Sequence, residues 1–112
     1  MERTRKTVHR HGKDTGRAAH LTLMADLFGM LSDPTRLKIL MYLQDHDEVC
    51  VSELAEWTEI SESAVSHALR LLRAHGIVDT RRDGRWIYYA LVDEHVRVLL
   101  EATVEHLERE HG

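Results

Sequence analysis

The chain has 112 residues, of which 43% are hydrophobic and 30% charged, with a formal net charge of −4 and one cysteine. This length fits one small domain, and the composition is ordinary for a globular protein. No apolar run approaches the roughly 18 residues of a membrane span or forms a signal peptide, and one cysteine excludes an internal disulfide, so we expect a cytoplasmic protein without a membrane partner.

The N-terminal segment, residues 1–15, is polar and basic and shows no periodicity, so we expect a flexible basic arm. Residues 16–112 are expected to form one domain, which opens with a helix over 18–31 because apolar residues recur there at helical spacing. Asp33 and Pro34 predict the start of a second helix, since Asp is a favoured N-cap and proline suits the first helical position.

Two further helices follow in the middle of the chain. The first is short, around residues 51–58, with Leu54 and Trp57 expected to point inward. Ser61 suits the N-cap of the second, and Gly76 is well placed to end it. A short helix, a turn and a longer helix with a polar face predict a helix-turn-helix.

The C-terminal part begins with a predicted hairpin. The dipeptide Asp83-Gly84 separates the β-prone runs 77–82 and 85–91, which is a strong signal for a two-residue turn. A last helix is expected over 93–110. The fold class is therefore mainly α with a β-hairpin wing, a winged helix-turn-helix.

Charge and composition single out the fourth helix, which begins after Ser61, and the hairpin as a DNA-binding face. Residues 61–91 carry five Lys/Arg against three acids, and phosphate contact requires local positive charge rather than a positive total. The candidate DNA-binding residues are Ser63, Ser66, His67 and Arg70 on the helix and Arg81, Arg82 and Arg85 on the hairpin. The alternatives are a plain solvated helix face and a charged hairpin that prevents edge aggregation.

Three stretches, residues 31–40, 61–73 and 81–89, resemble the ArsR/SmtB family of metal-responsive repressors in order and spacing. The family usually has His at the position of Ala68, where this sequence departs from it. The resemblance implies a homodimer paired through its first and last helices, which binds double-stranded operator DNA with two-fold symmetry. It also implies a regulator rather than an enzyme, with no small organic substrate.

The closing helix holds the best candidates for metal ligands among the nine histidines. His95 and His106 are eleven residues apart, so they share one stripe of a helix but lie about 16 Å apart along its axis. A zinc ion holds its ligands at about 2 Å, so one helix cannot bring both rings to one ion. An antiparallel second copy would bring His95 of one chain beside His106 of the other, giving two symmetric inter-subunit sites.

The resemblance adds Asp93 as a third ligand, although its position also suits an N-cap. The family's fourth ligand position is occupied here by Arg109, which cannot coordinate a metal. Glu110 lies on the face of His106 and is the first replacement, with His111 or water as alternatives. This donor set suits zinc, with cobalt or nickel possible, and argues against copper(I).

Two further expectations come from the resemblance. His106 is expected to pass the metal signal to DNA through a hydrogen bond to the backbone at Gly76. A second metal site could combine Cys50 with three other side chains. These three are Glu53, His9 and His11. The alternative is a semi-buried cysteine and a polar tail.

Two other function classes are alternatives to a metal-responsive repressor. A winged-helix regulator without a metal input would respond to pH or to a partner, and it would apply if the closing-helix histidines bind nothing. An enzyme is not expected, because the sequence lacks His-Glu-x-x-His and any defensible Ser/His/Asp or Cys/His pairing.

Overall fold

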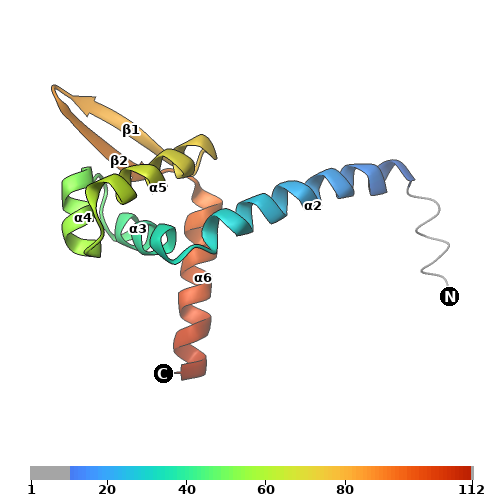
Figure 1. The fold of residues 1–112 in the computed structure, drawn as a ribbon. Coiled ribbons are helices and arrows are strands. Elements are labelled where there is room, and N and C mark those ends of the chain that lie inside the picture. Colours follow the sequence, from blue (N-terminus) through green and yellow to red (C-terminus); the bar gives the residue numbers. More distant parts are fainter. Residues whose placement is uncertain (1–10, 112) are drawn as a thin grey trace.

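The computed structural model describes residues 11–111, with side chains from residue 16 onward. Within this range it contains five helices and a two-stranded hairpin, which confirms the winged helix-turn-helix expected from the sequence (Figure 1). The elements are α2 (His11–Leu31), α3 (Pro34–Asp45), α4 (Val51–Thr58), α5 (Glu62–Ala74), β1 (Val78–Asp83), β2 (Trp86–Leu91) and α6 (Glu94–His111). None of the helices described is long and apolar enough to span a bilayer.

Side-chain caps fix the starts of α3 and α5. The Arg36 amide donates to Asp33 Oδ2 at 3.0 Å, and Pro34 occupies the first helical position. The Ala64 amide donates to Ser61 Oγ at 3.2 Å. Each cap satisfies a backbone amide that has no partner within the helix. Both predicted helix starts are therefore confirmed.

Helices α4 and α5 form the helix-turn-helix. Glu59 follows α4 with a left-handed backbone, φ +61°, and redirects the chain toward Ser61. Val65, Leu69 and Leu72 on α5 have no exposed surface, so one face of this helix is held by the core. The opposite face of α5 remains free to meet a partner.

Trp57 lies differently from the sequence-based expectation, which placed it inward on α4. Its side chain is 49% exposed, whereas Leu54 on the same short helix has no exposed surface. The Trp57 ring packs against Tyr42 of α3, with 4.6 Å between the ring centroids. An eight-residue helix presents little more than one row to the core, and Leu54 and Thr58 occupy that row.

The hairpin turn lies one residue later than the sequence suggested. Asp83 pairs with Trp86, so the two loop residues are Gly84 and Arg85 rather than Asp83 and Gly84. Gly84 has φ +64° at the first loop position, where a type II′ turn requires glycine. The Asp-Gly signal located the hairpin correctly but implied the neighbouring register.

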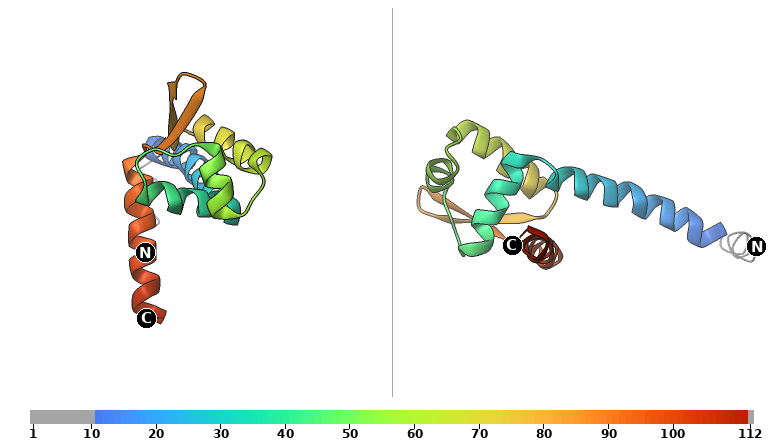
Figure 2. Two further views of the ribbon diagram at one scale, coloured as in Figure 1. Left: turned by 90° about the vertical axis from the view of Figure 1, so that its left-hand side faces the viewer. Right: turned by 90° about the horizontal axis from the view of Figure 1, so that it is seen from below.

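The core lies where α3, α4 and α5 meet the base of the hairpin and the first turns of α6 (Figure 2). Side chains without exposed surface are Ile39, Leu40, Leu43, Val49, Leu54, Val65, Leu69, Leu72 and Ile77. Val96 and Leu100 of α6 join this cluster at 1% and 5% exposure. The buried residues therefore hold α5 and the first half of α6 in one body.

Helices α2 and α6 project from this body in different directions (Figures 1 and 2). The radius of gyration is 18.1 Å, against about 13 Å for a compact domain of this length. Large apolar side chains on the projecting helices are half exposed or more, namely Leu21, Leu23, Met24 and Phe28 on α2 and Val98 on α6. Apolar surface gathered in this way is typical of an interface.

The first helix begins earlier than expected. Its start at His11 falls within residues 1–15, which the sequence suggested were an arm, so residues 11–15 continue the helix. Residues 1–10 lie outside the described range. The expected boundary between arm and domain at residue 15 therefore stays a prediction.

Candidate DNA-binding face and metal-binding helix

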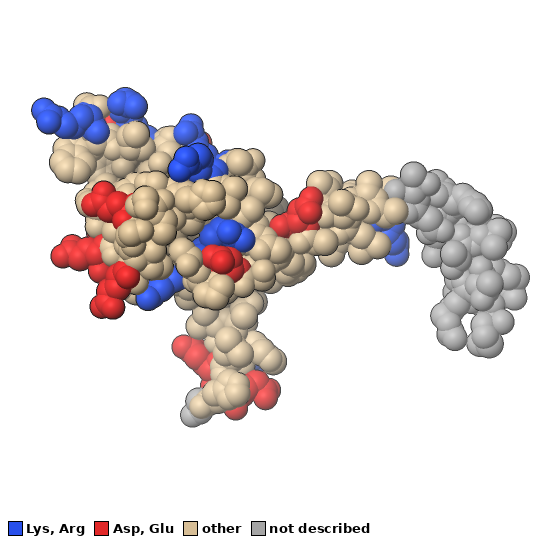
Figure 3. Space-filling model, in the orientation of Figure 1, with Lys and Arg blue, Asp and Glu red and all other residues tan. Residues whose placement is uncertain are grey.

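The four polar residues expected to contact DNA lie together on α5. Ser63, His67 and Arg70 are exposed and Ser66 is half-buried, on the side of the helix opposite its buried leucines. Lys and Arg gather along the edge formed by α5 and the hairpin, whereas Asp and Glu gather beside α4 and along α6 (Figure 3). This edge can follow the phosphate backbone while α5 enters the major groove.

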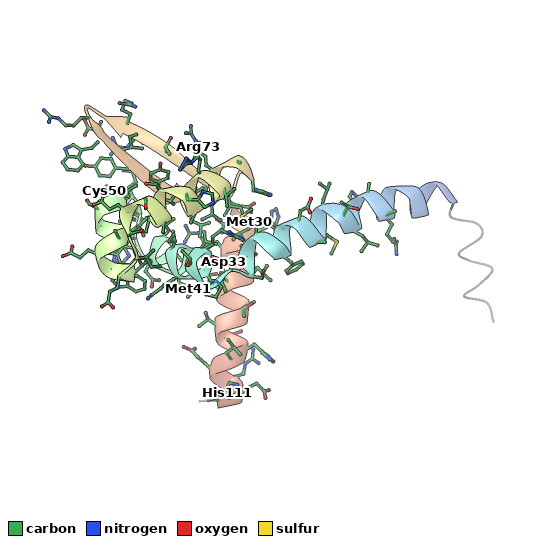
Figure 4. All side chains as sticks on the ribbon, in the orientation of Figure 1. Met30, Asp33, Met41, Cys50, Arg73 and His111 are labelled. Atoms are coloured by element: carbon green, nitrogen blue, oxygen red, sulfur yellow. The ribbon has the colours of Figure 1, made fainter. Side chains whose placement is uncertain are left out.

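Arg73 extends this face and was not singled out from the sequence. It is exposed three residues after Arg70 on α5 and lies on the hairpin side of the helix (Figure 4). Its Nε lies 3.7 Å from Asp79 Oδ1, and both side chains are more than half exposed. Such a long, solvated ion pair is weak. The i, i+3 spacing from Arg70 is the signal that could have identified it.

The three hairpin arginines are in different environments. All three side chains are exposed, and Arg82 and Arg85 lie nearest the turn. Arg81 is paired with Glu48: its Nε donates to the two carboxylate oxygens at 2.8 and 3.1 Å, and its Nη2 donates at 2.9 Å. These bonds hold the pKa of Glu48 below its usual range and raise the pKa of Arg81. Arg81 is therefore already engaged within the protein.

Asp93 caps α6. Its Oδ1 accepts a hydrogen bond from the Val96 amide at 3.1 Å, and its carbonyl accepts from the Arg97 amide at 3.0 Å. This is the N-cap arrangement that the sequence offered as an alternative to metal binding. The cap uses one carboxylate oxygen, and metal coordination requires only one, so the two roles are compatible.

His95 and His106 lie on α6 and are both exposed. The helix is continuous from Glu94 to His111, so their eleven-residue separation corresponds to about 16 Å along the axis. Within the part of the chain that the structure describes, no three His, Cys, Asp or Glu side chains converge on a metal-sized site. A site that uses these histidines therefore requires a second copy of the protein.

The end of α6 holds the candidates for a fourth ligand. Arg109 donates to Glu105 at 3.0 Å, back along the helix. Glu110 is exposed in the last turn, and the helix continues to His111 (Figure 4). His111 would reach the side of His106 only if this turn frayed, so the continuous helix favours Glu110.

The proposed hydrogen bond between His106 and Gly76 is not formed within one protomer. Gly76 lies between α5 and β1 with φ +72°, and its amide donates to the Arg73 carbonyl at 2.9 Å. The C-terminal half of α6 runs away from this junction (Figure 1). A link of this kind would have to cross to another subunit.

The expected second metal site is only partly described. Cys50 is half-buried just before α4, and its Sγ lies 3.2 Å from Ser52 Oγ. Glu53 accepts a hydrogen bond from the Tyr42 hydroxyl at 2.6 Å, which raises the pKa of Tyr42. His9 and the side chain of His11 lie outside the described residues and side chains. The Cys50 site stays a prediction.

Arg97 connects α6 to the rest of the body. Its side chain is only 29% exposed. Its Nη1 donates to the Gln44 carbonyl at 3.1 Å, and its Nη2 donates to the Leu91 carbonyl at 3.2 Å. Arg97 therefore ties the first turn of α6 to the end of α3 and to the end of the wing.

Comparison with known proteins places this architecture among bacterial regulators. Residues 33–80 match the profile described as bacterial regulatory protein, arsR family. The chain is 46% identical over 85 residues to the transcriptional repressor SmtB homolog of Synechocystis, an alignment that covers 76% of this chain and 64% of that protein. It is 40% identical over 99 residues to the cadmium resistance transcriptional regulatory protein CadC homolog of Staphylococcus aureus, covering 88% of this chain and 81% of that protein.

A solved structure has the same fold. The homodimeric winged helix-turn-helix DNA-binding domain Mb0332 of Mycobacterium bovis, described as a possible ArsR-family transcriptional regulator, superposes with a TM-score of 0.72 at 33% identity. The superposition covers 85% of this chain and 86% of that chain.

Proposed function

The chain belongs to the ArsR family of bacterial regulatory proteins, and on this premise we propose that it is a homodimeric repressor released from its operator by a transition-metal ion. Its relatives are DNA-binding transcriptional regulators rather than enzymes. Zinc is the first candidate for the metal, with cobalt and nickel as alternatives. The proposed site of action is the cytoplasm, where a bacterial regulator meets its DNA.

Operator binding is assigned to the edge formed by α5 and the hairpin. Arg70 is the best candidate for reading a base, because an exposed Arg on a recognition helix can bind guanine through two hydrogen bonds. Arg82 and Arg85 are assigned to phosphate contacts beside the wing. A two-fold dimer would place its recognition helices about one helical turn apart, so the operator should have matching two-fold symmetry.

The projecting helices support dimerisation. An apolar groove runs between α2, α3 and α6, and it is lined by Phe28, Leu31, Leu37, Leu99, Leu100 and Thr103. The exposed apolar side chains of α2 continue this surface beyond the body. Pairing of α6 with its symmetry copy, together with α2, would cover this groove. The solved Mycobacterium bovis relative is a homodimer, which is consistent with this arrangement.

The observation that carries the metal proposal is the exposed position of His95 and His106 on one stripe of a projecting helix. Asp93 and His95 of one protomer would bind the ion together with His106 and Glu110 of the partner subunit. Two imidazoles and two carboxylates form a donor set that zinc accepts in a tetrahedral site. The name of the Staphylococcus relative, a cadmium resistance regulator, also points to a divalent metal.

Release from DNA would follow from fixing α6 against its copy. Arg97 joins the start of α6 to the ends of α3 and β2, so a shift of α6 is carried to the wing. His106 is proposed to add a second link through Gly76 of the partner subunit. The metal-bound dimer would then favour a conformer that cannot span both half-sites. Couplings of this kind are typically about 1–3 kcal/mol, or roughly five- to 150-fold in affinity.

The proposal is tested by measuring operator affinity with and without each metal. The probe is a fluorescent DNA duplex selected from a random pool by the metal-free wild-type protein. Zinc should lower the affinity of the wild type at least fivefold, and His106→Asn should lose this response. His46→Ala is the matched control, because His46 is an exposed histidine at the end of α3 that stacks on Tyr42 and is not a proposed ligand.

Three outcomes decide whether a metal bound at α6 releases the protein from DNA. A response lost in His106→Asn and retained in His46→Ala supports the α6 site. Full release of His106→Asn by zinc contradicts it. If zinc, cobalt and nickel all leave the wild-type affinity unchanged, the chain is a winged-helix regulator without a metal input.

A further inference from the structure

A cluster of three side chains crosses one face of the wing. Arg81 projects from β1, Tyr88 lies opposite it on β2, and Glu48 lies on the segment between α3 and α4. The guanidinium carbon of Arg81 lies 5.1 Å from the centroid of the Tyr88 ring. The same guanidinium donates to both oxygens of Glu48 through Nε and Nη2. We call these three residues the wing clamp.

The segment that carries Glu48 pairs with β2 through its backbone, as a third extended segment beside the hairpin. The Val49 amide donates to the Tyr89 carbonyl at 3.0 Å, and the Tyr89 amide donates to the Val49 carbonyl at 2.8 Å. Val49 has no exposed surface, so this pairing is fixed to the core. Successive side chains of an extended segment point to opposite faces, which places Glu48 on the face of Tyr88 and Arg81. The clamp thus spans three adjacent backbone segments.

A two-stranded hairpin alone is at best marginally stable in water, so its direction depends on what holds its base. Here the hairpin is held at its third and fourth residue pairs from the base, by the Val49 pairing at one edge and by the clamp across one face. The turn with Arg85, and Arg82 on the opposite face of β1, lie farther along the same hairpin. The angle of the hairpin to α5 therefore decides where these two arginines meet DNA.

We propose that Glu48 and Arg81 are positioning residues that set the angle of the wing for operator binding, and that Arg81 does not contact DNA itself. The inference rests on the proposed operator binding. A guanidinium held by a carboxylate through two nitrogens forms a pair without net charge, so it releases few counterions from DNA. The clamp also explains why an acidic residue lies beside a DNA-binding wing, where it would otherwise oppose phosphate binding.

The direction in which one substitution changes DNA affinity distinguishes a positioning role from a purely electrostatic one. Glu48→Gln removes a negative charge near DNA, which by itself should strengthen binding. If the clamp positions the wing, Glu48→Gln should instead weaken binding of the selected duplex by about threefold, the size expected for an exposed charged pair. Tighter binding of Glu48→Gln would overturn the proposal.

Exchange of the two charges provides a rescue test. Arg81→Glu alone should weaken operator binding strongly, and adding Glu48→Arg should recover most of the loss because the pair is restored in reverse. The matched control is Arg82→Glu, whose side chain lies on the opposite face of β1. Glu48→Arg should not rescue Arg82→Glu. No recovery in the exchanged pair, or equal recovery in both pairs, contradicts the proposal.

Amide hydrogen exchange tests the clamp without DNA. Glu48→Gln and Arg81→Gln should speed exchange at the Val49 and Tyr89 amides and leave the Leu69 amide of α5 unchanged. Unaltered exchange at both wing amides would refute the clamp even if DNA binding changed. A wild-type protein that binds no duplex better than random DNA would instead contradict operator binding, and this exchange measurement would still decide the clamp.

Discussion

Two substitutions at Asp93 separate its role as the N-cap of α6 from its proposed role as a metal ligand. It caps α6 through the hydrogen bond from the Val96 amide to Oδ1, and it is proposed as a metal ligand. Asp93→Asn keeps an oxygen that can accept the Val96 hydrogen bond but loses the anionic ligand. Asp93→Ala loses both. The two variants should therefore agree in metal affinity and differ in stability.

The size of the stability difference follows from the cap. Removing an N-cap acceptor costs about 1 kcal/mol, whereas losing only the charge near the helix N-terminus costs about 0.5 kcal/mol. For a domain of this length, each kcal/mol corresponds to about 4 °C in melting temperature. Asp93→Ala should melt about 4–6 °C below the wild type, and Asp93→Asn about 2 °C below it.

Thermal unfolding of the metal-free protein and competition with a zinc chelator measure the two effects. Both Asp93 variants should bind zinc at least tenfold more weakly than the wild type. Asp33 is the matched control, because it caps α3 through the Arg36 amide at 3.0 Å and lies outside the proposed site. Asp33→Ala should lower the melting temperature and leave zinc affinity unchanged. Wild-type zinc affinity in Asp93→Asn would refute the ligand role and leave only the cap.

Three further predictions concern the DNA face and the metal ligands. Arg70→Ala should weaken operator binding by about 1–3 kcal/mol in a fluorescence titration; an equal loss on random DNA would show that Arg70 contacts only phosphate. Cys50→Ser should leave metal-driven release of DNA intact. If Cys50→Ser loses the response and His95→Ala keeps it, the Cys50 site rather than the α6 site drives the release. Glu110→Gln should weaken zinc binding while His111→Ala should not, as measured by chelator competition; the opposite result would make His111 the fourth ligand.

Local sequence patterns were sufficient for most of the fold. The caps at Asp33 and Ser61 are determined by residues within one helical turn, so they could be identified without tertiary information. The buried row of α5 follows from its apolar spacing. The hairpin was located by Asp83-Gly84, but two adjacent registers satisfy that dipeptide, and strand pairing selects the later one.

Interactions between distant segments were not predictable in this way. Arg81 and Glu48 are 33 residues apart in the sequence, and only the pairing of Val49 with Tyr89 brings them together. Arg97 resembles one more charged residue on a helix face, yet it donates to a carbonyl 53 residues away. Trp57 was expected to point inward, but Leu54 and Thr58 occupy the buried row of α4.

The candidate metal site can be predicted only in part from a single chain. The spacing of His95 and His106 predicts that they share a stripe, and α6 is a continuous helix over both. Their meeting with a second copy depends on surfaces that one protomer leaves exposed, chiefly the apolar side chains of α2 and α6. The sequence therefore predicts candidate ligands, whereas the proposed site would be completed only by a second subunit.

Mixed dimers test most directly whether His95 and His106 of different subunits share a metal ion. In a dimer of one His95→Ala protomer and one His106→Ala protomer, one inter-subunit site loses both histidines and the other keeps both, as two-fold symmetry requires. Neither variant alone should bind zinc tightly or respond to it on DNA, and the two variants mixed after unfolding and refolding together should recover tight zinc binding and zinc-driven release. Absence of recovery in mixtures that demonstrably form mixed dimers would contradict metal sites shared between subunits.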